Sequence, residues 1–400
     1  MFNLTWKERI ISTIEGNQVD FLPFIPRMDL WFRANKLRKT LPKKYANSSL
    51  KEITIDLGIG YHALVPDYSN FKTEFKDAGY ALGIHNISTL PYKVDFSNIK
   101  YKLKRHLGQT TVKYFTPFGN ITTMTIYDKR MKQSGISSPL ISERAIKSKK
   151  DYKAVEYIFE NIKVEKDYED YLEFEEYVGD RGLAAGYCTG SASPMHLIMQ
   201  YLMPYELFIY ELHDNEKEIK KLACSINSYY TNVFEIVLKS PARLIFSGGN
   251  YDINLTPPKF FREYLTPSLL LQSKKAHAVN KLLITHTDGE NKGLLSEFLK
   301  SNIDVADSIC PYPMTGLTLG EIREVFEDKI TIWGGLPSIC ALENSMSDYN
   351  FEKFINKTLE YIGTGKKIIL SFADTLPPDA KFERIEKVAE LARGFKFSNL

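Results

Sequence analysis

The sequence predicts an α/β fold in which parallel strands alternate with helices. Short apolar runs rich in Ile, Leu and Val recur in the second half of the chain, and a helical pattern follows each run. This alternation indicates βαβ units, because neighbouring parallel strands need a crossover connection between them. About five such units follow residue 243, and the upstream chain has room for three more. The number favours an eight-stranded (β/α)₈ TIM barrel over an open sheet.

The second half of the chain has the clearest order of elements. Strands are predicted at 243–247, 281–286, 303–307, 329–333 and 367–371. Helices are predicted from 256 onward, near 292–301, and at 318–326, 349–362 and 379–394. The first of these helices opens with Pro257-Pro258, and proline suits a first helical turn because its missing N–H has no partner there in any case.

The first half follows the same order less regularly. A helical extension is expected at the N-terminus, a strand at 183–187, and helices at 151–179, 194–201 and 203–213. Residues 98–128 alternate as in β-hairpins around a turn at 107–109, so we expect an inserted antiparallel flap. We therefore predict that residues 1–400 form a single barrel domain that carries this insertion.

The composition excludes several classes of protein. Hydrophobic residues make up 44% of the chain and charged residues 25%, which is typical of a globular protein with a large core. The net charge is only +3 and Lys is interleaved with Asp and Glu, so no nucleic-acid surface is expected. No stretch approaches the roughly 20 apolar residues of a membrane span. The four cysteines form no CxxC pair and no signal peptide is evident, which together favour the cytoplasm.

The segment from His286 to Glu290 is the most informative part of the chain. It follows a buried apolar strand, and residues two apart in a strand point to the same side, so His286 and Asp288 should project together at the strand end. An imidazole beside a carboxylate there is typical of a metal or proton-transfer site. The alternative is that Asp288-Gly289 forms a turn while His286 is a hydrogen-bonded core residue. This segment alone does not separate the two.

Asp374 follows the last predicted strand and precedes a rigid Pro-Pro pair. It either caps this turn or joins His286 and Asp288 as the third member of a site. One imidazole with two carboxylates suits Zn²⁺, and also Mn²⁺ or Fe²⁺. Three protein ligands leave a coordination position open, as Lewis-acid catalysis requires.

Polar residues gather after most of the predicted strands. In a barrel the loops after the strands converge on one mouth, so this distribution favours an enzyme. The segments are 26–29, 62–67, 187–189, 247–252, 286–288, 310–312, 333–335 and 373–374. From them and the adjoining Glu290 we take Asp29, Asp288 and Glu290 as candidates for catalysis or for orienting a ligand, and Arg27, Tyr187, Asn250, Asp252 and Trp333 as candidates for substrate binding.

Taken together, these elements resemble the uroporphyrinogen decarboxylase superfamily, whose fold is a (β/α)₈ barrel. The similarity is carried by His286-x-Asp288-Gly289, by the strands 303–307 and 329–333 with the Gly-Gly that follows, and by Val19-Asp20-Phe21-Leu22-Pro23 as a first strand. The decarboxylase branch has an Arg-Gln-Ala-Gly-Arg type of segment after the first strand. Here the matching place is Pro26-Arg27-Met28-Asp29-Leu30-Trp31-Phe32-Arg33, without the glycine and its spacing.

The resemblance is nearer to the branch of corrinoid-dependent zinc methyltransferases and demethylases. Thiol-methylating members have His-x-Cys and a distant Cys, where this chain has His286-x-Asp288 and Asp374. Carboxylates in place of thiolates leave a more electrophilic metal, better suited to polarising an ether oxygen or another leaving group. The resemblance thus implies Zn²⁺ or another divalent metal, and a corrinoid carried by a partner protein.

Our main hypothesis is a metal-dependent enzyme that moves a methyl group from a small methylated substrate to a corrinoid protein. We expect no nucleic-acid or membrane partner, and at most assembly into a homodimer. A second hypothesis is a cofactor-free decarboxylase or lyase, in which Arg27 and Arg33 hold a substrate carboxylate and Asp288 or Asp29 handles protons. The third, from another class, is a non-catalytic barrel that binds a small ligand.

Overall fold

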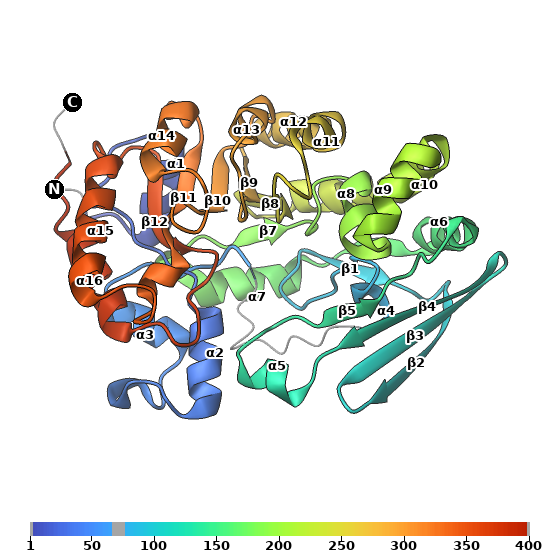
Figure 1. The fold of residues 1–400 in the computed structure, drawn as a ribbon, viewed down its shortest axis with the longest axis horizontal. Helices are drawn as coiled ribbons and strands as arrows, with labels where there is room; N and C mark the ends of the chain where they lie inside the picture. The colour runs from blue at the N-terminus through green and yellow to red at the C-terminus, as the bar shows by residue number, and fades with distance from the viewer. Residues whose placement is uncertain (1–2, 66–76, 398–400) are drawn as a thin grey trace.

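The computed structural model describes residues 3–65 and 77–397, and a parallel sheet lies at its centre (Figure 1). Within the described residues this sheet has six strands, in the order in which they follow along the chain. They are β7 (Ala185–Tyr187), β8 (Leu244–Gly249), β9 (Leu282–His286), β10 (Val305–Ile309), β11 (Thr331–Pro337) and β12 (Ile368–Ala373). Every residue of β8 to β12 is buried, as expected for parallel strands covered on both faces. The predicted strands are confirmed to within a few residues.

Helices connect consecutive strands of this sheet, which confirms the predicted βαβ order. Between β7 and β9 they are α8 (Pro194–Leu197), α9 (Tyr205–Asp214), α10 (Glu216–Lys239), α11 (Pro258–Phe260) and α12 (Thr266–His277), with π-helical turns η4 (Ile198–Leu202) and η5 (Phe261–Leu265). After β9 they are α13 (Leu295–Lys300), α14 (Leu319–Phe326), α15 (Asp348–Ile362) and α16 (Phe382–Arg393). The sequence sets these starts locally: Thr318 and Glu321, for example, form a capping box at the start of α14.

The predicted closure into eight strands is not confirmed, because the described residues form six regular parallel strands. Two extended segments lie between the outer strands instead. Phe24 forms a single parallel bridge with Leu370 of β12, and its carbonyl accepts a hydrogen bond from Gly60 N. Ala63 O then accepts from Ala185 N of β7. The expected first strand is thus an extended segment, and Pro23 in it cannot donate to a ladder.

The antiparallel flap is confirmed and is longer than predicted. Its strands are β2 (Lys100–His106), β3 (Gln109–Thr116), β4 (Gly119–Ile126) and β5 (Leu140–Glu143), with α5 (Lys129–Gln133) before the last. The predicted turn is present, with Leu107 at φ 46° and Gly108 at φ 80°, a left-handed backbone that glycine tolerates well. Figure 1 shows this sheet beside the parallel one, at the lower right.

Most of the remaining elements lie upstream of the parallel sheet, and η6 follows β11 within it. The N-terminal helices are α1 (Trp6–Glu15), α2 (Asp29–Arg38), α3 (Leu50–Asp56) and α4 (Asp77–Tyr80). Short 3₁₀ turns are η1 (Lys43–Tyr45), η2 (Lys149–Asp151), η3 (Gly179–Arg181) and η6 (Ser338–Ala341). The prediction of helix throughout 151–179 is wrong at its centre, where β6 (Lys163–Lys166) separates α6 (Tyr152–Asn161) from α7 (Tyr168–Val178). Strand β6 forms because it pairs with β1 (Tyr92–Asp95), which is distant in sequence.

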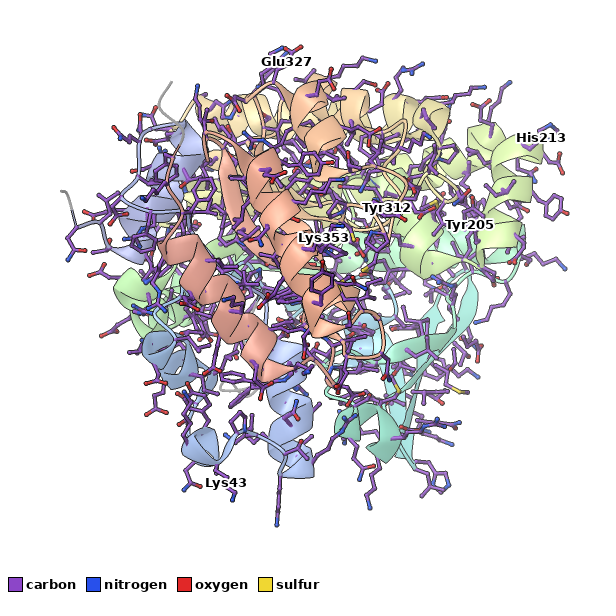
Figure 2. All side chains as sticks on the ribbon, turned by 60° about the vertical axis from the view of Figure 1, so that its left-hand side comes forward. Lys43, Tyr205, His213, Tyr312, Glu327 and Lys353 are labelled. Atoms are coloured by element: carbon purple, nitrogen blue, oxygen red, sulfur yellow. The ribbon has the colours of Figure 1, made fainter. Side chains whose placement is uncertain are left out.

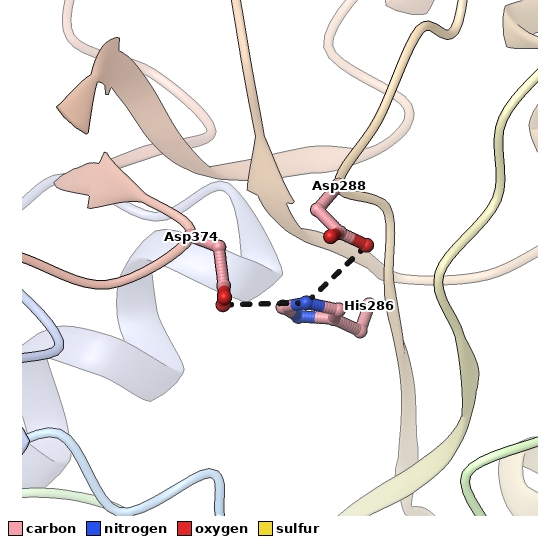
Figure 3. Close-up of side chains that lie close together, drawn as sticks. All are labelled: His286, Asp288 and Asp374. Carbon is pink, nitrogen blue, oxygen red and sulfur yellow. Dashed lines mark ion pairs between the residues drawn. The ribbon is translucent and has the colours of Figure 1, made fainter. Parts of the chain in front are cut away.

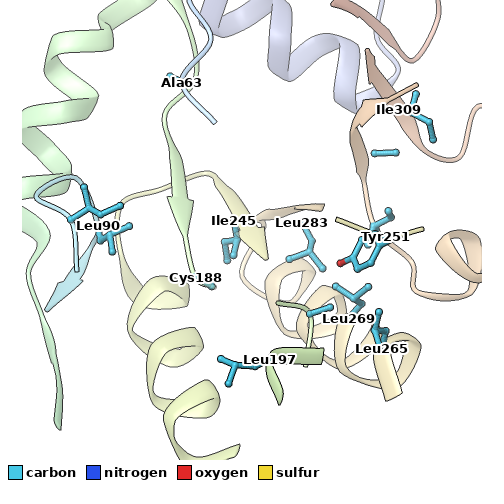
Figure 4. Close-up of a cluster of buried hydrophobic side chains, with 14 of the residues drawn as sticks. Ala63, Leu90, Cys188, Leu197, Ile245, Tyr251, Leu265, Leu269, Leu283 and Ile309 are labelled. Atoms are coloured by element: carbon cyan, nitrogen blue, oxygen red, sulfur yellow. The ribbon is translucent and has the colours of Figure 1, made fainter. Parts of the chain in front are cut away.

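Apolar side chains from the sheet and its helices form the core (Figure 4). Ile245 and Leu283 from neighbouring strands are fully buried, as are Leu265 and Leu269 from the segment that covers them. This packing holds the carboxyl ends of the strands at one edge of the sheet. Within the described part of the chain, no helix combines the length and apolarity that crossing a membrane requires.

Candidate metal centre

Three side chains predicted to form a site meet at the carboxyl ends of two strands (Figure 3). His286 is the last residue of β9, Asp288 follows two residues later, and Asp374 comes directly after β12. One ligand atom from each side chain lies within 4.8 Å of the other two. The imidazole Nε2 is 3.4 Å from Asp288 Oδ1 and 3.3 Å from Asp374 Oδ1. The structure thus confirms that these three side chains lie close together.

A fourth side chain, Asp307, orients the imidazole. It lies beside His286 in the parallel register of β10 and β9, and its Oδ2 is 2.6 Å from His286 Nδ1. Since both groups are buried, this short contact fixes the ring with Nε2 toward the other two carboxylates. Sequence reasoning did not select Asp307. The available signal was a carboxylate within an otherwise apolar strand.

Arg27 contacts Asp374 at the same oxygen that faces His286. Its Nη1 donates to Asp374 Oδ1 and its Nε donates to Asp29 Oδ1, both at 3.0 Å. The backbone supports this arrangement, because Leu376 N donates to Arg27 O. Asp29 therefore contacts the guanidinium, and it is not a member of the group that meets at His286. The structure thus gives Asp29 an arginine as its direct partner, and a catalytic role for it stays a prediction.

The carboxylates dominate the electrostatics of the centre. Burial lowers the pKa of His286, but Asp288, Asp374 and the hydrogen bond with Asp307 outweigh it and raise that pKa to about 9. Burial raises the pKa of Asp288. Burial also acts to raise the pKa of Asp374, yet the charges of Arg27 and His286 leave it below its usual range. Without an ion, the imidazole is therefore protonated at neutral pH and balances part of the negative charge.

A cavity of about 260 Å³ adjoins the centre, and Arg27, His286 and Asp374 form part of its wall. Of the residues predicted to bind substrate, Tyr187 and Asn250 also line it. Its other walls include side chains that sequence reasoning did not select, from α4, from the loop before β5 and from β8. The centre is thus placed against a space that a small molecule can occupy.

Five predicted site residues lie outside this lining, namely Asp29 and Asp288, which are described above, and Asp252, Glu290 and Trp333. Trp333 is buried inside β11, where its Nε1 donates to Ile25 O over 3.2 Å. Asp252 accepts a hydrogen bond from Glu290 N at 3.0 Å, and Glu290 accepts one from Gly316 N at 2.6 Å. The latter two side chains hold loops together. Because side chains alternate along a strand, Trp333 points into a buried apolar cluster that includes Ile284.

The upstream polar segment 62–67 is described only in part. His62 packs edge-on against Trp333, and burial lowers its pKa to about 4. It also lines a small pocket of about 10 Å³ with Arg27 and Asp29. Asp67, at the end of the predicted segment, lies outside the described residues.

No protein-family model matches the sequence, and no curated protein is similar enough to be matched. Among solved structures, the chain is similar to a methyltransferase from Methanosarcina mazei with a TM-score of 0.53. The similarity covers 98% of this chain and 99% of that one, at 13% sequence identity. Identity this low shows a shared fold and nothing finer.

Proposed function

We propose that this protein is a metal-dependent enzyme of methyl transfer, with a divalent ion held by His286, Asp288 and Asp374. The observation that carries the proposal is the convergence of these three ligand atoms beside a cavity whose wall includes His286 and Asp374. We also propose that the segments 23–25 and 60–63 complete an eight-stranded barrel around this centre, in place of two regular strands. The fold shared with a methyltransferase supports the reaction class.

The chemistry of the donors fits a divalent ion. Asp288 Oδ1 is buried and accepts no hydrogen bond from any residue that the structure describes. A buried carboxylate oxygen without a donor is costly, and a cation removes that cost. His286 has its Nδ1 engaged by Asp307, so that its Nε2 can present a lone pair when the ring is neutral. One nitrogen and two oxygen donors suit Zn²⁺ and also Mn²⁺ or Fe²⁺.

The ion would supply a Lewis acid that polarises the atom to which the methyl group of the substrate is bonded. The residues of the chain position the reactants. Arg27 restrains Asp374, and Asp307 restrains the imidazole. Gly249 lets the backbone pass close to the centre, because a methyl group built on it would lie 2.9 Å from His286 Cβ. As methyl acceptor we propose a corrinoid on a separate protein, in line with the superfamily that the sequence resembles.

Metal analysis of the purified protein tests the proposal. After growth with added zinc, we expect about one ion per chain by mass spectrometry, and a substoichiometric amount in His286→Ala and Asp288→Asn variants. His213→Ala is the matched control, since His213 projects from α9 at the edge of the molecule (Figure 2) and its side chain is 87% exposed. Equal ion content in wild type and His286→Ala, or none in wild type, would refute the metal centre.

The reaction class needs its own assay. Methylated ethers, alcohols and amines are incubated with the metal-loaded protein and free cob(I)alamin, and formation of methylcobalamin is followed by its absorbance. Turnover of at least one compound that the His286→Ala variant fails to convert is expected. Chelation should abolish it, and added Zn²⁺ should restore it.

A cofactor-free decarboxylase or lyase is the second candidate, favoured by the position of Arg27 in the cavity wall. Two observations make this candidate less well supported than methyl transfer. Arg27 is already balanced by Asp29 and Asp374. Arg33 does not line the cavity, and its guanidinium donates to the Tyr127 hydroxyl at 3.1 Å. Carboxylate-dependent turnover that persists in strong chelator would support this candidate.

A further inference from the structure

An aromatic wall leads along the cavity from the metal centre to a second polar cluster. The ring of Phe246 lies 6.4 Å from that of His286, and Tyr187 stacks on Phe246 at 5.1 Å with an interplanar angle of 21°. His85 then meets Tyr187 edge to face at 5.6 Å. All four residues line the cavity. The wall therefore connects an ionic centre with a cluster built around an imidazole.

Polar atoms of this cluster converge on the space beside Gly190. A methyl group built on Gly190 would lie 2.9 Å from Tyr201 Oη, 3.1 Å from Tyr187 Oη and 3.5 Å from His85 Nε2. A side chain at position 190 would therefore crowd these three polar atoms. Three polar atoms around one point resemble the few placed groups that orient a ligand in an otherwise apolar pocket.

His85 supports the assignment of a binding role. Its Nε2 is buried and has no hydrogen-bond partner among the described residues. Edge-to-face packing against Tyr80, Tyr187 and Tyr201 holds the ring in place. Burial lowers the pKa of His85 to about 4, so it is an uncharged imidazole at neutral pH. A fixed, buried nitrogen without a partner is satisfied when a ligand brings one.

The charges around the cavity indicate which kind of ligand group can bind at this cluster. The ionised lining residues Arg27 and Asp374 are paired with each other at the metal centre, together with His286. The cluster at Gly190 adds phenol hydroxyls and a neutral imidazole. A carboxylate or an ammonium group there would be buried without an opposite charge, which is unfavourable. A hydroxyl group both donates and accepts, and so it matches phenols and either tautomer of His85.

We propose that His85, Tyr187 and Tyr201 form a subsite that binds the hydroxyl group of an uncharged substrate. The body of that molecule packs along Phe246, and its methyl-bearing end reaches the metal centre. The inference deepens the proposed function, on which it rests, by naming the substrate class as uncharged hydroxyl compounds. The subsite itself is tested by binding, without turnover.

Three probes with one ring and different head groups test it by isothermal titration calorimetry on the purified protein: phenol, benzoate and phenyltrimethylammonium. Phenol should bind most tightly. Gly190→Ala places a methyl group in the space where the polar atoms converge, and it should weaken phenol binding at least tenfold. Because the atoms it meets are ends of side chains that can shift, we expect it to fold. Gly394→Ala is the matched control, at the end of α16 with φ −82°.

His85→Phe is the second variant, because it keeps a ring and removes the unpaired nitrogen. It should weaken phenol binding about three- to tenfold, as loss of one hydrogen bond does. Tighter binding of benzoate or of phenyltrimethylammonium, or unchanged phenol binding in both variants, would overturn the subsite. Ion content is measured on the same samples. If the wild-type protein holds its ion but does not bind phenol, the subsite alone is refuted. If it binds phenol but holds no ion, the metal centre alone is refuted.

Discussion

The contact between Asp307 and His286 yields the sharpest prediction about the metal centre. Asp307→Asn keeps the size and shape of the side chain and removes the charge that faces Nδ1 at 2.6 Å. A hydrogen bond to a charged group contributes about 1.5–3 kcal/mol, which corresponds to about 10–150-fold in affinity. Loss of such a partner behind a metal ligand usually weakens binding by about 10–100-fold. We therefore expect zinc affinity to fall by about 10–100-fold.

The assay is competition with a chelator of known affinity, followed at constant pH. Asp304→Asn is the matched control, because Asp304 pairs with a different histidine, His277, at 2.8 Å just before the start of β10. That variant should bind zinc as wild type does. Zinc affinity within twofold of wild type in Asp307→Asn would refute the argument that Asp307 positions His286.

The same substitution has a second effect in the metal-free protein. Asp307 and the other carboxylates raise the pKa of His286 from an ordinary 6.5 to about 9. A histidine pKa raised by folding stabilises the fold fully below pH 6.5, and this contribution is lost as the pH rises through 9. Each pKa unit corresponds to about 1.4 kcal/mol. The stability difference between wild type and Asp307→Asn should therefore shrink between pH 6.5 and 9 in urea unfolding.

Three further predictions concern the centre and the core. Zinc must displace the proton of His286, so its apparent affinity should rise about tenfold per pH unit from 7 to 9, with about one proton released in calorimetry at pH 7; no proton release would contradict this. Asp288→Asn should abolish zinc binding without lowering the melting temperature of the metal-free protein, because burial raises the pKa of Asp288 in spite of the nearby His286, so that its ionised form destabilises the fold at neutral pH. Ile245→Ala should cost about 2–5 kcal/mol in urea unfolding, whereas Ile55→Ala, at a side chain 51% exposed, should cost far less.

Much of the fold could be predicted from local sequence. Strands β8 to β12 are continuous apolar runs between polar loops, a pattern that burial on both faces of a parallel sheet imposes. The grouping of His286, Asp288 and Asp374 followed from the same reasoning, since each comes at or after the carboxyl end of a strand in one sheet. These features depend on residues close in sequence and on the rule that the carboxyl ends of parallel strands lie at one edge of a sheet.

Other features were decided only by the tertiary structure. Strand β6 was predicted as helix, because its pairing with β1 cannot be read from Lys163–Lys166 alone. The partnership of Asp307 with His286 depends on the register between two strands. Arg27 reaches Asp374, which is 347 residues away, only through the packing of an N-terminal segment on β12. His85 lies in a stretch without a recognisable pattern, and its proposed role depends on Tyr187 and Tyr201 from distant segments as well as on the nearby Tyr80.

The division has a physical cause. Apolar periodicity is a property of neighbouring residues, so the sequence by itself determined which segments are strands and which polar residues end them. Hydrogen bonds between side chains and the shape of a cavity depend on distances across the fold to within fractions of an ångström. Only packing of the whole chain decides which imidazole faces an acid and which faces an open space.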